Sequence, residues 1–213
     1  SLTDFTPTAT NTAGDLRLGS GSTFVQAVET KQQILVFTDK AVFSMRFIGP
    51  PFTFGLQELS KNITIMSPKS AIAIDDAVFW MGKDSFYVYG GQTQQIPCSV
   101  RDFVFSDFNT FQAEKVFGAV NSGFSEVWWY YPSADATENN RYVVFNYGES
   151  KGVPMGNWYT GQNTNSIRTT WIDSIVYPKP YATQFNSSAT GTFPSIVGES
   201  GLGQTVYFQH DTG

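Results

Sequence analysis

Few residues of this sequence have the type and spacing that chemistry needs. His210 is the single histidine of the 213 residues, and no serine or cysteine stands in a recognised nucleophile motif, so a Ser-His-Asp triad is not predicted. Aspartates could pair for glycoside hydrolysis, but most stand at predicted turns, where their short side chains suit the backbone. The Ser/Thr-x-Asp-x-Gly-x-x-Trp box of sialidase propellers is absent, and we expect no enzymatic activity. The aspartates considered are Asp39, Asp75, Asp76, Asp84, Asp102 and Asp107.

The sequence also predicts no cofactor and no metal site. Cys98 is the only cysteine, so neither an intrachain disulfide nor a Cys/His zinc site is expected. No glycine-rich phosphate loop precedes a helix. The formal net charge is −5 without a cluster of Lys and Arg, which argues against a groove that grips phosphates. No apolar run approaches the roughly 18 residues that span a bilayer, so membrane insertion is not expected.

The densest group of candidate site residues is aromatic. Trp128, Trp129, Tyr130 and Tyr131 follow one another in a strand-like run that Pro132 ends. Alternation along a strand places Trp128 and Tyr130 on one face and Trp129 and Tyr131 on the other. One pair can therefore be core, while the other packs between sheets or subunits, or forms a platform on which a sugar stacks. We favour packing.

A short repeat indicates how the chain is organised. The run that begins at Asp39 (DKAVFSM) returns 36 residues later at Asp75 (DDAVFWM), each time after an apolar run. Apolar run, acidic turn and Val-Phe strand together predict a β-hairpin in each copy. Hairpins recurring at about 40–50 residues are typical of propeller blades. In this register, Val-aromatic pairs recur at Val42, Val78, Val127 and Val206.

These patterns predict an all-β, propeller-like fold of about four blades. The ring of blades formed by this chain can be incomplete. A β-sandwich shares the same alternation and turn spacing and is the alternative. We divide the chain into a polar amino-terminal arm, residues 1–22, and a β-propeller-like domain, residues 23–213. We expect a strand at Ile63–Met66, a connector at Leu56–Lys61, and a short helix near Val100–Phe111. The least regular unit is the fourth, with strands expected at 169–173, 181–185, 195–198 and 205–209.

Several stretches resemble structural tail proteins of short-tailed bacteriophages. They are the run from Ile34 to Pro51, the run from Ala77 to Gly91 with Ile96-Pro97-Cys98, and Glu126–Tyr131 followed by Arg141–Tyr147. The chain is similar over roughly Thr23 to Ala182 to a β-propeller found in tail hub or nozzle proteins, a family also described as packaged-DNA stabilisation proteins. Members of that family are longer, so this chain would be one domain or fragment of such a protein.

The resemblance implies a non-enzymatic structural protein of the virion, made in the host cytoplasm. It implies a homo-oligomeric ring, with six copies as the suggested number, that contacts other tail and portal or adaptor proteins. The ring would continue the portal channel and retain or conduct DNA without sequence-specific binding, and the acidic balance of the chain suits a channel through which DNA slides.

Two alternative functions remain open at this point. The first is a non-catalytic propeller module that binds a sugar or a protein partner, for which Trp129 or Tyr131 would have to lie in a pocket. The second is a degenerate glycoside-active propeller, which would need two carboxylates roughly 5–10 Å apart.

Overall fold

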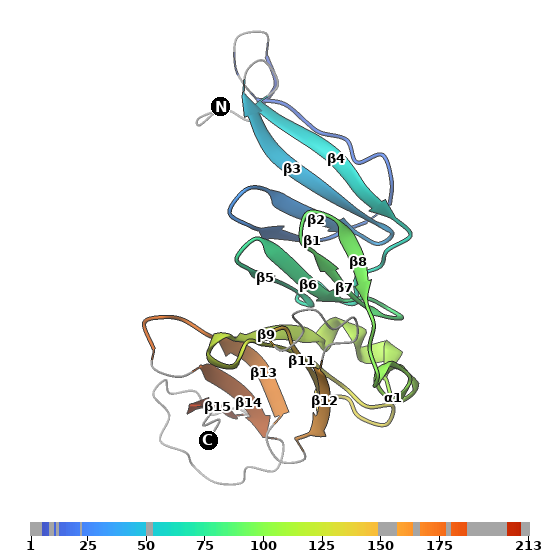
Figure 1. Cartoon of the computed structure of the whole chain (residues 1–213), viewed down its shortest axis with the longest axis vertical. Helices are drawn as coiled ribbons and strands as arrows, with labels where there is room; N and C mark the ends of the chain where they lie inside the picture. Colours follow the sequence, from blue (N-terminus) through green and yellow to red (C-terminus); the bar gives the residue numbers. More distant parts are fainter. Residues whose placement is uncertain are drawn as a thin grey trace. The chain divides into compact units, whose positions relative to one another are not determined.

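The structure is a computed structural model that describes residues 6–8, 11, 13–21, 23–49, 53–148, 157–163, 167–177, 180–186 and 204–209. Over these residues the chain is mostly strand, arranged as four antiparallel sheets in chain order, and none of them closes into a barrel (Figure 1). The all-β fold class is confirmed, and four antiparallel sheets in chain order are consistent with the propeller-like arrangement and with the sandwich alternative. No helix in the described part of the chain is long and apolar enough to cross a membrane.

The first two sheets come from the amino-terminal half of the chain. The first sheet has the order β1-β2-β3-β4 and the second the order β5-β6-β7-β8, so each is a simple meander. Their strands are β1 (Phe24–Glu29), β2 (Ile34–Thr38), β3 (Ala41–Gly49), β4 (Thr53–Lys61), β5 (Ala71–Ile74), β6 (Ala77–Met81), β7 (Phe86–Tyr89) and β8 (Thr93–Ile96).

The other two sheets follow a short helical segment. α1 (Arg101–Ser106) and a 3-10 helix (Thr110–Lys115) lead into the third sheet, whose order is β12-β11-β10-β9, and the fourth has the order β13-β14-β15. Their strands are β9 (Phe117–Asn121), β10 (Glu126–Tyr131), β11 (Arg141–Asn146), β12 (Asn157–Gln162), β13 (Ile167–Ile172), β14 (Tyr181–Asn186) and β15 (Gln204–Gln209). The helix expected near Val100–Phe111 is therefore present, and it is shorter than that range.

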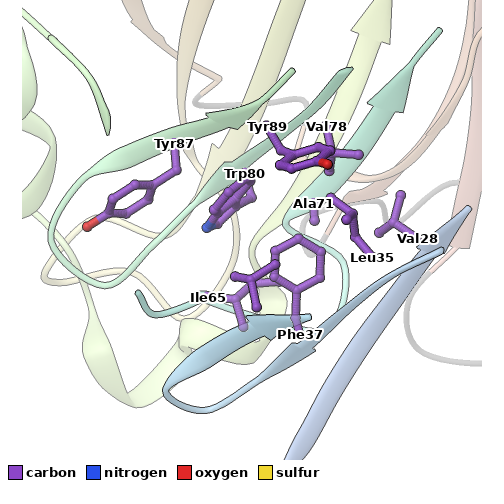
Figure 2. Packing of buried hydrophobic residues seen from close by; sticks show 10 residues of the cluster. Val28, Leu35, Phe37, Ile65, Ala71, Val78, Trp80, Tyr87 and Tyr89 are labelled. Carbon is purple, nitrogen blue, oxygen red and sulfur yellow. The ribbon is translucent and has the colours of Figure 1, made fainter. Parts of the chain in front are cut away.

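The chain divides into two compact units. Unit 1 is Ser1–Lys83 with Tyr87–Gln94, and unit 2 is Asp84–Phe86 with Gln95–Gly213. In unit 1, residues of the first two sheets share one apolar core in which the ring of Trp80 meets Phe37 edge-on at 5.1 Å and stacks on Tyr87 at 5.5 Å (Figure 2). The buried residues of this inner core are Val28, Leu35, Phe37, Val42, Ile65, Ala71, Val78, Trp80, Tyr87 and Tyr89.

The opposite face of the first sheet has a smaller apolar cluster, which we call the outer cluster. Its buried members are Val36, Ala41 and Phe43. Leu18, from the predicted polar arm, packs against them, so part of residues 1–22 lies on the sheet. The first sheet therefore carries buried apolar side chains on both faces, one packed in the inner core and the other contacted by Leu18.

The repeat does not occupy equivalent places in the first two sheets. Both copies form the expected hairpins, with Phe37 opposite Val42 and Ile74 opposite Ala77. The first copy is the hairpin β2–β3, in the middle of its sheet, whereas the second is β5–β6, at the start of its sheet. The prediction that the repeat marks the blade register is wrong, because β1 precedes the first copy as an additional strand.

Two segment predictions around this repeat are also wrong. Leu56–Lys61, expected as a connector, belongs to the nine-residue strand β4 and pairs with β3. Ile63–Met66, expected as a strand, forms none. Its backbone is joined to β6 by separate hydrogen bonds instead. The indole Nε1 of Trp80 donates to the Thr64 carbonyl at 3.3 Å, and the Met66 amide donates to the Met81 carbonyl at 2.9 Å. Of the four strands expected in the fourth unit, the one at 195–198 lies outside the described residues.

Candidate functional site

The aromatic run forms strand β10 in the middle of the third sheet. β10 pairs with β9 on one side and with β11 on the other, with Trp129 opposite Gly118 and Val143. Central position and antiparallel pairing on both edges fix the alternation of the side chains. The four aromatics therefore divide into the two pairs that the sequence predicts.

Trp129 and Tyr131 point into one apolar layer of unit 2. Neither side chain exposes any surface. The ring of Trp129 lies 5.0 Å from that of Phe86 and 6.3 Å from that of Trp158, while Tyr131 faces Phe108 at 6.0 Å. Tilted and offset rings at these distances are the favoured packing geometry of aromatic side chains. This pair is core and does not lie in a pocket.

Trp128 and Tyr130 point to the other face, toward the fourth sheet. Tyr130 is buried and stacks on Phe117 at 4.9 Å. Trp128 is half-buried, stacks on Trp171 of β13 at 6.3 Å, and donates its Nε1 hydrogen to the Glu126 carboxylate at 2.9 Å. The indole of Trp171 in turn donates to the Val120 carbonyl at 2.7 Å. A flat sugar-stacking platform is not formed, because another aromatic ring already covers this face.

Tyr131 has one chemical peculiarity within this packing. Its hydroxyl is buried and has no hydrogen-bond partner among the described residues. Burial raises the pKa of Tyr131 to about 12, the Asp107 carboxylate adds to the rise, and the Arg141 guanidinium opposes it. Arg141 and Asp107 are themselves an ion pair, with 3.1 Å between Nε and Oδ2. Because burial is the cause of the raised pKa, the pH dependence of stability tests whether the Tyr131 hydroxyl is buried.

We expect Tyr131→Phe to leave the free energy of unfolding at pH 7 unchanged within about 0.5 kcal/mol, or to raise it, because a buried hydroxyl without a partner contributes nothing favourable. The wild type should lose stability as pH rises from 10 to about 12, at up to about 1.4 kcal/mol per pH unit from this group, because the unfolded state ionises first. The variant should lack that contribution. Urea unfolding at pH 7 and pH 11 measures both effects.

Tyr130→Phe is the matched comparison for this variant. The Tyr130 hydroxyl has a hydrogen bond with Arg168, so its removal should cost about 1–3 kcal/mol at pH 7. Equal costs for the two variants would contradict the assignment of an unpartnered hydroxyl to Tyr131.

The structure does not gather the other candidate residues into one site. Asp39 accepts a hydrogen bond from the Thr23 amide at 3.2 Å, and Asp75 forms an exposed ion pair with Lys31 at 2.8 Å. The hydrogen bond from Lys31 lowers the pKa of Asp75. Within the described part of the chain, no three His, Cys, Asp or Glu side chains are placed to share a metal ion. His210 lies outside the described residues.

The single cysteine is also placed without a reactive setting. Cys98 is partly buried, and that burial raises the pKa of its thiol to about 11, against a smaller opposing effect of the Val100 backbone. A thiol with so high a pKa is almost entirely protonated near neutral pH and is a poor nucleophile.

A polar pocket in unit 1 was not predicted from the sequence. Its volume is about 390 Å³, and it lies where the β1–β2 turn, β3, the β5–β6 turn and the end of β7 meet. Arg46 lies on its wall, and its Nε donates to Gln33 Oε1 at 2.6 Å; Asp76 supplies an acidic group. The lining residues come from positions between Thr30 and Gly91, and they meet only because the first two sheets pack against each other.

Exposed apolar side chains at the ends of hairpins are a second feature that the sequence did not reveal. On β3 and β4 these are Phe47, Ile48 and Phe54. In unit 2, Ile175, Val176 and Tyr177 are exposed in the turn after β13. Apolar side chains gathered on projecting structure are typical of interaction surfaces.

Comparisons with known proteins identify no family. No protein-family model matches the chain, and no curated protein is similar to it. Among solved structures, a chain aligns from a S. cerevisiae complex of a Dbp5 variant bound to Nup159, a Gle1 variant, IP6 and ADP. The alignment has 10% identity and a TM-score of 0.44, and it covers 90% of this chain and 45% of that one. This chain thus spans less than half the length of the chain it aligns with.

Proposed function

We propose that this chain is a structural component of a short-tailed phage tail, which assembles with further copies into part of a ring or nozzle that retains or conducts packaged DNA. Its role in this proposal is non-enzymatic. The proposal starts from the resemblance of the stretches between Thr23 and Ala182 to tail hub and nozzle proteins, and from the acidic charge, which disfavours adhesion of DNA to a channel wall.

The observation that carries the proposal is the packing of the aromatic strand β10. Three of its four aromatic side chains are fully or almost fully buried, and the fourth, Trp128, is covered by Trp171. The most aromatic stretch of the chain is therefore used to hold sheets together. The large aromatic side chains of β10 stabilise the packing of sheets, and apolar side chains are exposed at the ends of hairpins. This combination suits a protein that assembles with other chains.

A second candidate function is a binding module for a small polar ligand, and the pocket of unit 1 favours it. Arg46 and Asp76 place one cation and one anion on its wall, and small-molecule sites combine a few such polar groups with an apolar lining. The aromatic strand does not take part in this candidate, because Trp129 and Tyr131 are core residues.

The mass of the particle in solution tests the first proposal. Light scattering over a wide range of protein concentration should give a mass several times the 23.6 kDa of one chain, and electron microscopy of the same sample should show rings. A mass of one chain at every concentration, together with specific binding on a glycan array, would contradict the proposal and favour the pocket.

A further inference from the structure

The polar pocket of unit 1 receives side chains from both sheets of that unit. Arg46 of β3, Asp76 of the β5–β6 turn and Tyr89 at the end of β7 lie on its wall. Its volume of about 390 Å³ falls in the lower part of the range of about 300–1,000 Å³ that is usual for small-molecule sites. The lining residues all belong to unit 1, so one compact unit forms the whole pocket.

The guanidinium group of Arg46 is held at one edge and free at the other. Its Nε donates to Gln33 Oε1 at 2.6 Å and to the Ser44 hydroxyl at 3.2 Å, and that hydroxyl donates to the same Gln33 oxygen at 2.6 Å. Ser44 is buried, so this network fixes the guanidinium to the sheet. The two terminal nitrogens have no partner among the described residues. They form the planar fork that binds a carboxylate through two parallel hydrogen bonds.

Asp76 adds a carboxylate to the wall of the pocket. Its neighbour Asp75 forms the ion pair with Lys31 at 2.8 Å, and neither of these two residues lines the pocket. No cation of the described part of the chain lies within ion-pair distance of Asp76. The pocket therefore carries one cation and one anion, and each lacks an ion-pair partner in the chain.

The hydroxyl of Tyr89 is a third polar group of the pocket. The ring belongs to the inner core, and the residue is only 2% exposed (Figure 2). No hydrogen bond joins the hydroxyl to a described residue, and, unlike the hydroxyl of Tyr131, it is not sealed off from solvent. A tyrosine buried to this extent usually has a hydrogen-bond partner for its hydroxyl. The hydroxyl is thus available to a molecule in the pocket, whereas the face of the ring is not.

The charges on the wall favour one class of ligand. A molecule with one carboxylate and one ammonium group would pair with both Arg46 and Asp76, so neither charge would be desolvated without a partner. A phosphate monoester would bring nearly two negative charges at pH 7 to a single guanidinium and would be repelled by Asp76. An uncharged sugar would leave both wall charges unpaired, and the pocket offers it no open aromatic face on which to stack.

We propose that this pocket binds a small amino-carboxylate, whose carboxylate accepts from the terminal nitrogens of Arg46 and whose ammonium group donates to Asp76. The Tyr89 hydroxyl supplies a further hydrogen bond. This inference rests on the second candidate function, the binding of a small polar ligand, and adds the chemical class of that ligand. It does not depend on the assembly of the chain into a ring.

Probes that differ only in charge test the ligand class. Glycine, 4-aminobutanoate and 6-aminohexanoate carry both charges at different spacings, whereas butanoate and butylamine carry one charge each. In titrations followed by saturation-transfer NMR, we expect at least one amino-carboxylate to bind with a Kd at least about tenfold below those of butanoate and butylamine, because each single-charge probe lacks one charge-assisted contact.

Substitutions on the wall test the assigned contacts with the same probe. Arg46→Gln and Asp76→Asn should each weaken its binding by roughly 10- to 100-fold. Tyr89→Phe should weaken it by about 3- to 10-fold and leave the melting curve unchanged, since the hydroxyl has no partner in the described chain. Asp75→Asn is the matched control, because it removes the neighbouring carboxylate that does not line the pocket, and it should change the Kd by no more than about threefold.

Three outcomes would overturn the inference. Butanoate that binds as tightly as 4-aminobutanoate, or a Kd that Asp76→Asn leaves unchanged, would remove the ammonium contact. Binding of methyl glucoside without binding of any amino-carboxylate would overturn the ligand class and leave the binding function standing. The absence of binding by every probe at about 20 mM would overturn both the ligand class and the second candidate function. None of these results would alter the particle mass, which tests assembly separately.

Discussion

Replacing Trp129 by alanine is expected to lower the free energy of unfolding by about 3–5 kcal/mol. The indole exposes no surface and packs against the rings of Phe86 and Trp158, which also contact each other at 4.7 Å. Removing it leaves a cavity in the middle of the third sheet, because strands paired on both edges of β10 cannot collapse into the space. Urea unfolding followed by circular dichroism measures the loss, and hydrogen exchange of peptides from β9 to β11 locates it.

Trp128→Ala is the matched control, since it removes the same side chain from the neighbouring position. Trp128 is half-buried and would lose its ring contacts and its hydrogen bond to Glu126, so we expect a smaller cost of about 1–2 kcal/mol. A larger cost at Trp128 than at Trp129 would mean that the two faces of β10 have been assigned the wrong way round.

The third sheet is the part of the fold that the sequence predicts best. β10 runs over Glu126–Tyr131, as expected from the strand-like aromatic run that Pro132 ends, and β11 and β12 pair beside it in chain order. These strands are short, rich in aromatic and β-branched residues, and bounded by turn formers, so local preference and tertiary packing agree. Here the division of the aromatics into two faces follows from alternation alone.

The first two sheets show where local patterns fail. β4 contains Gly55 and polar residues, which weaken its strand preference, yet it pairs along the whole of β3. Ile63–Met66 has apolar alternation but forms no strand, and its backbone bonds to Trp80 and Met81 of β6 without a ladder. Pairing is a long-range interaction, so a register deduced from one repeated hairpin could not reveal that the copies occupy different places in their sheets.

The candidate surfaces depend on the same long-range information. The pocket of unit 1 needs loops from two sheets, and in the sequence the hairpin β3–β4 looks like any other pair of alternating strands. Phe47 continues the spacing of Phe43, which is buried. Only the end of β2 opposite Met45 shows that one phenylalanine is covered and the other is not. The sequence shows which side chains of a strand share a face. Whether those side chains are exposed depends on how far the neighbouring strands extend.

Trp80→Ala should have a comparable effect in unit 1, lowering the free energy of unfolding by about 3–5 kcal/mol. Trp80 is fully buried in the inner core, where it contacts Phe37 and Tyr87 (Figure 2). Its Nε1 hydrogen is donated to the Thr64 carbonyl. The substitution therefore removes both the largest side chain of this core and the hydrogen bond to the Thr64 carbonyl, while the bond from the Met66 amide to the Met81 carbonyl remains.

The loss of the hydrogen bond to Thr64 distinguishes Trp80→Ala from a substitution that only creates a cavity. We expect amide hydrogens of peptides covering 61–70 to exchange faster than those of β2 or β6, because the Thr64 carbonyl loses its donor. Trp80→Phe is the control that keeps most of the volume and removes the donor, and it should reproduce the faster exchange at a smaller cost in stability. Uniform loss of protection across unit 1 in both variants would contradict a separate role for the hydrogen bond and leave packing as the whole contribution of Trp80.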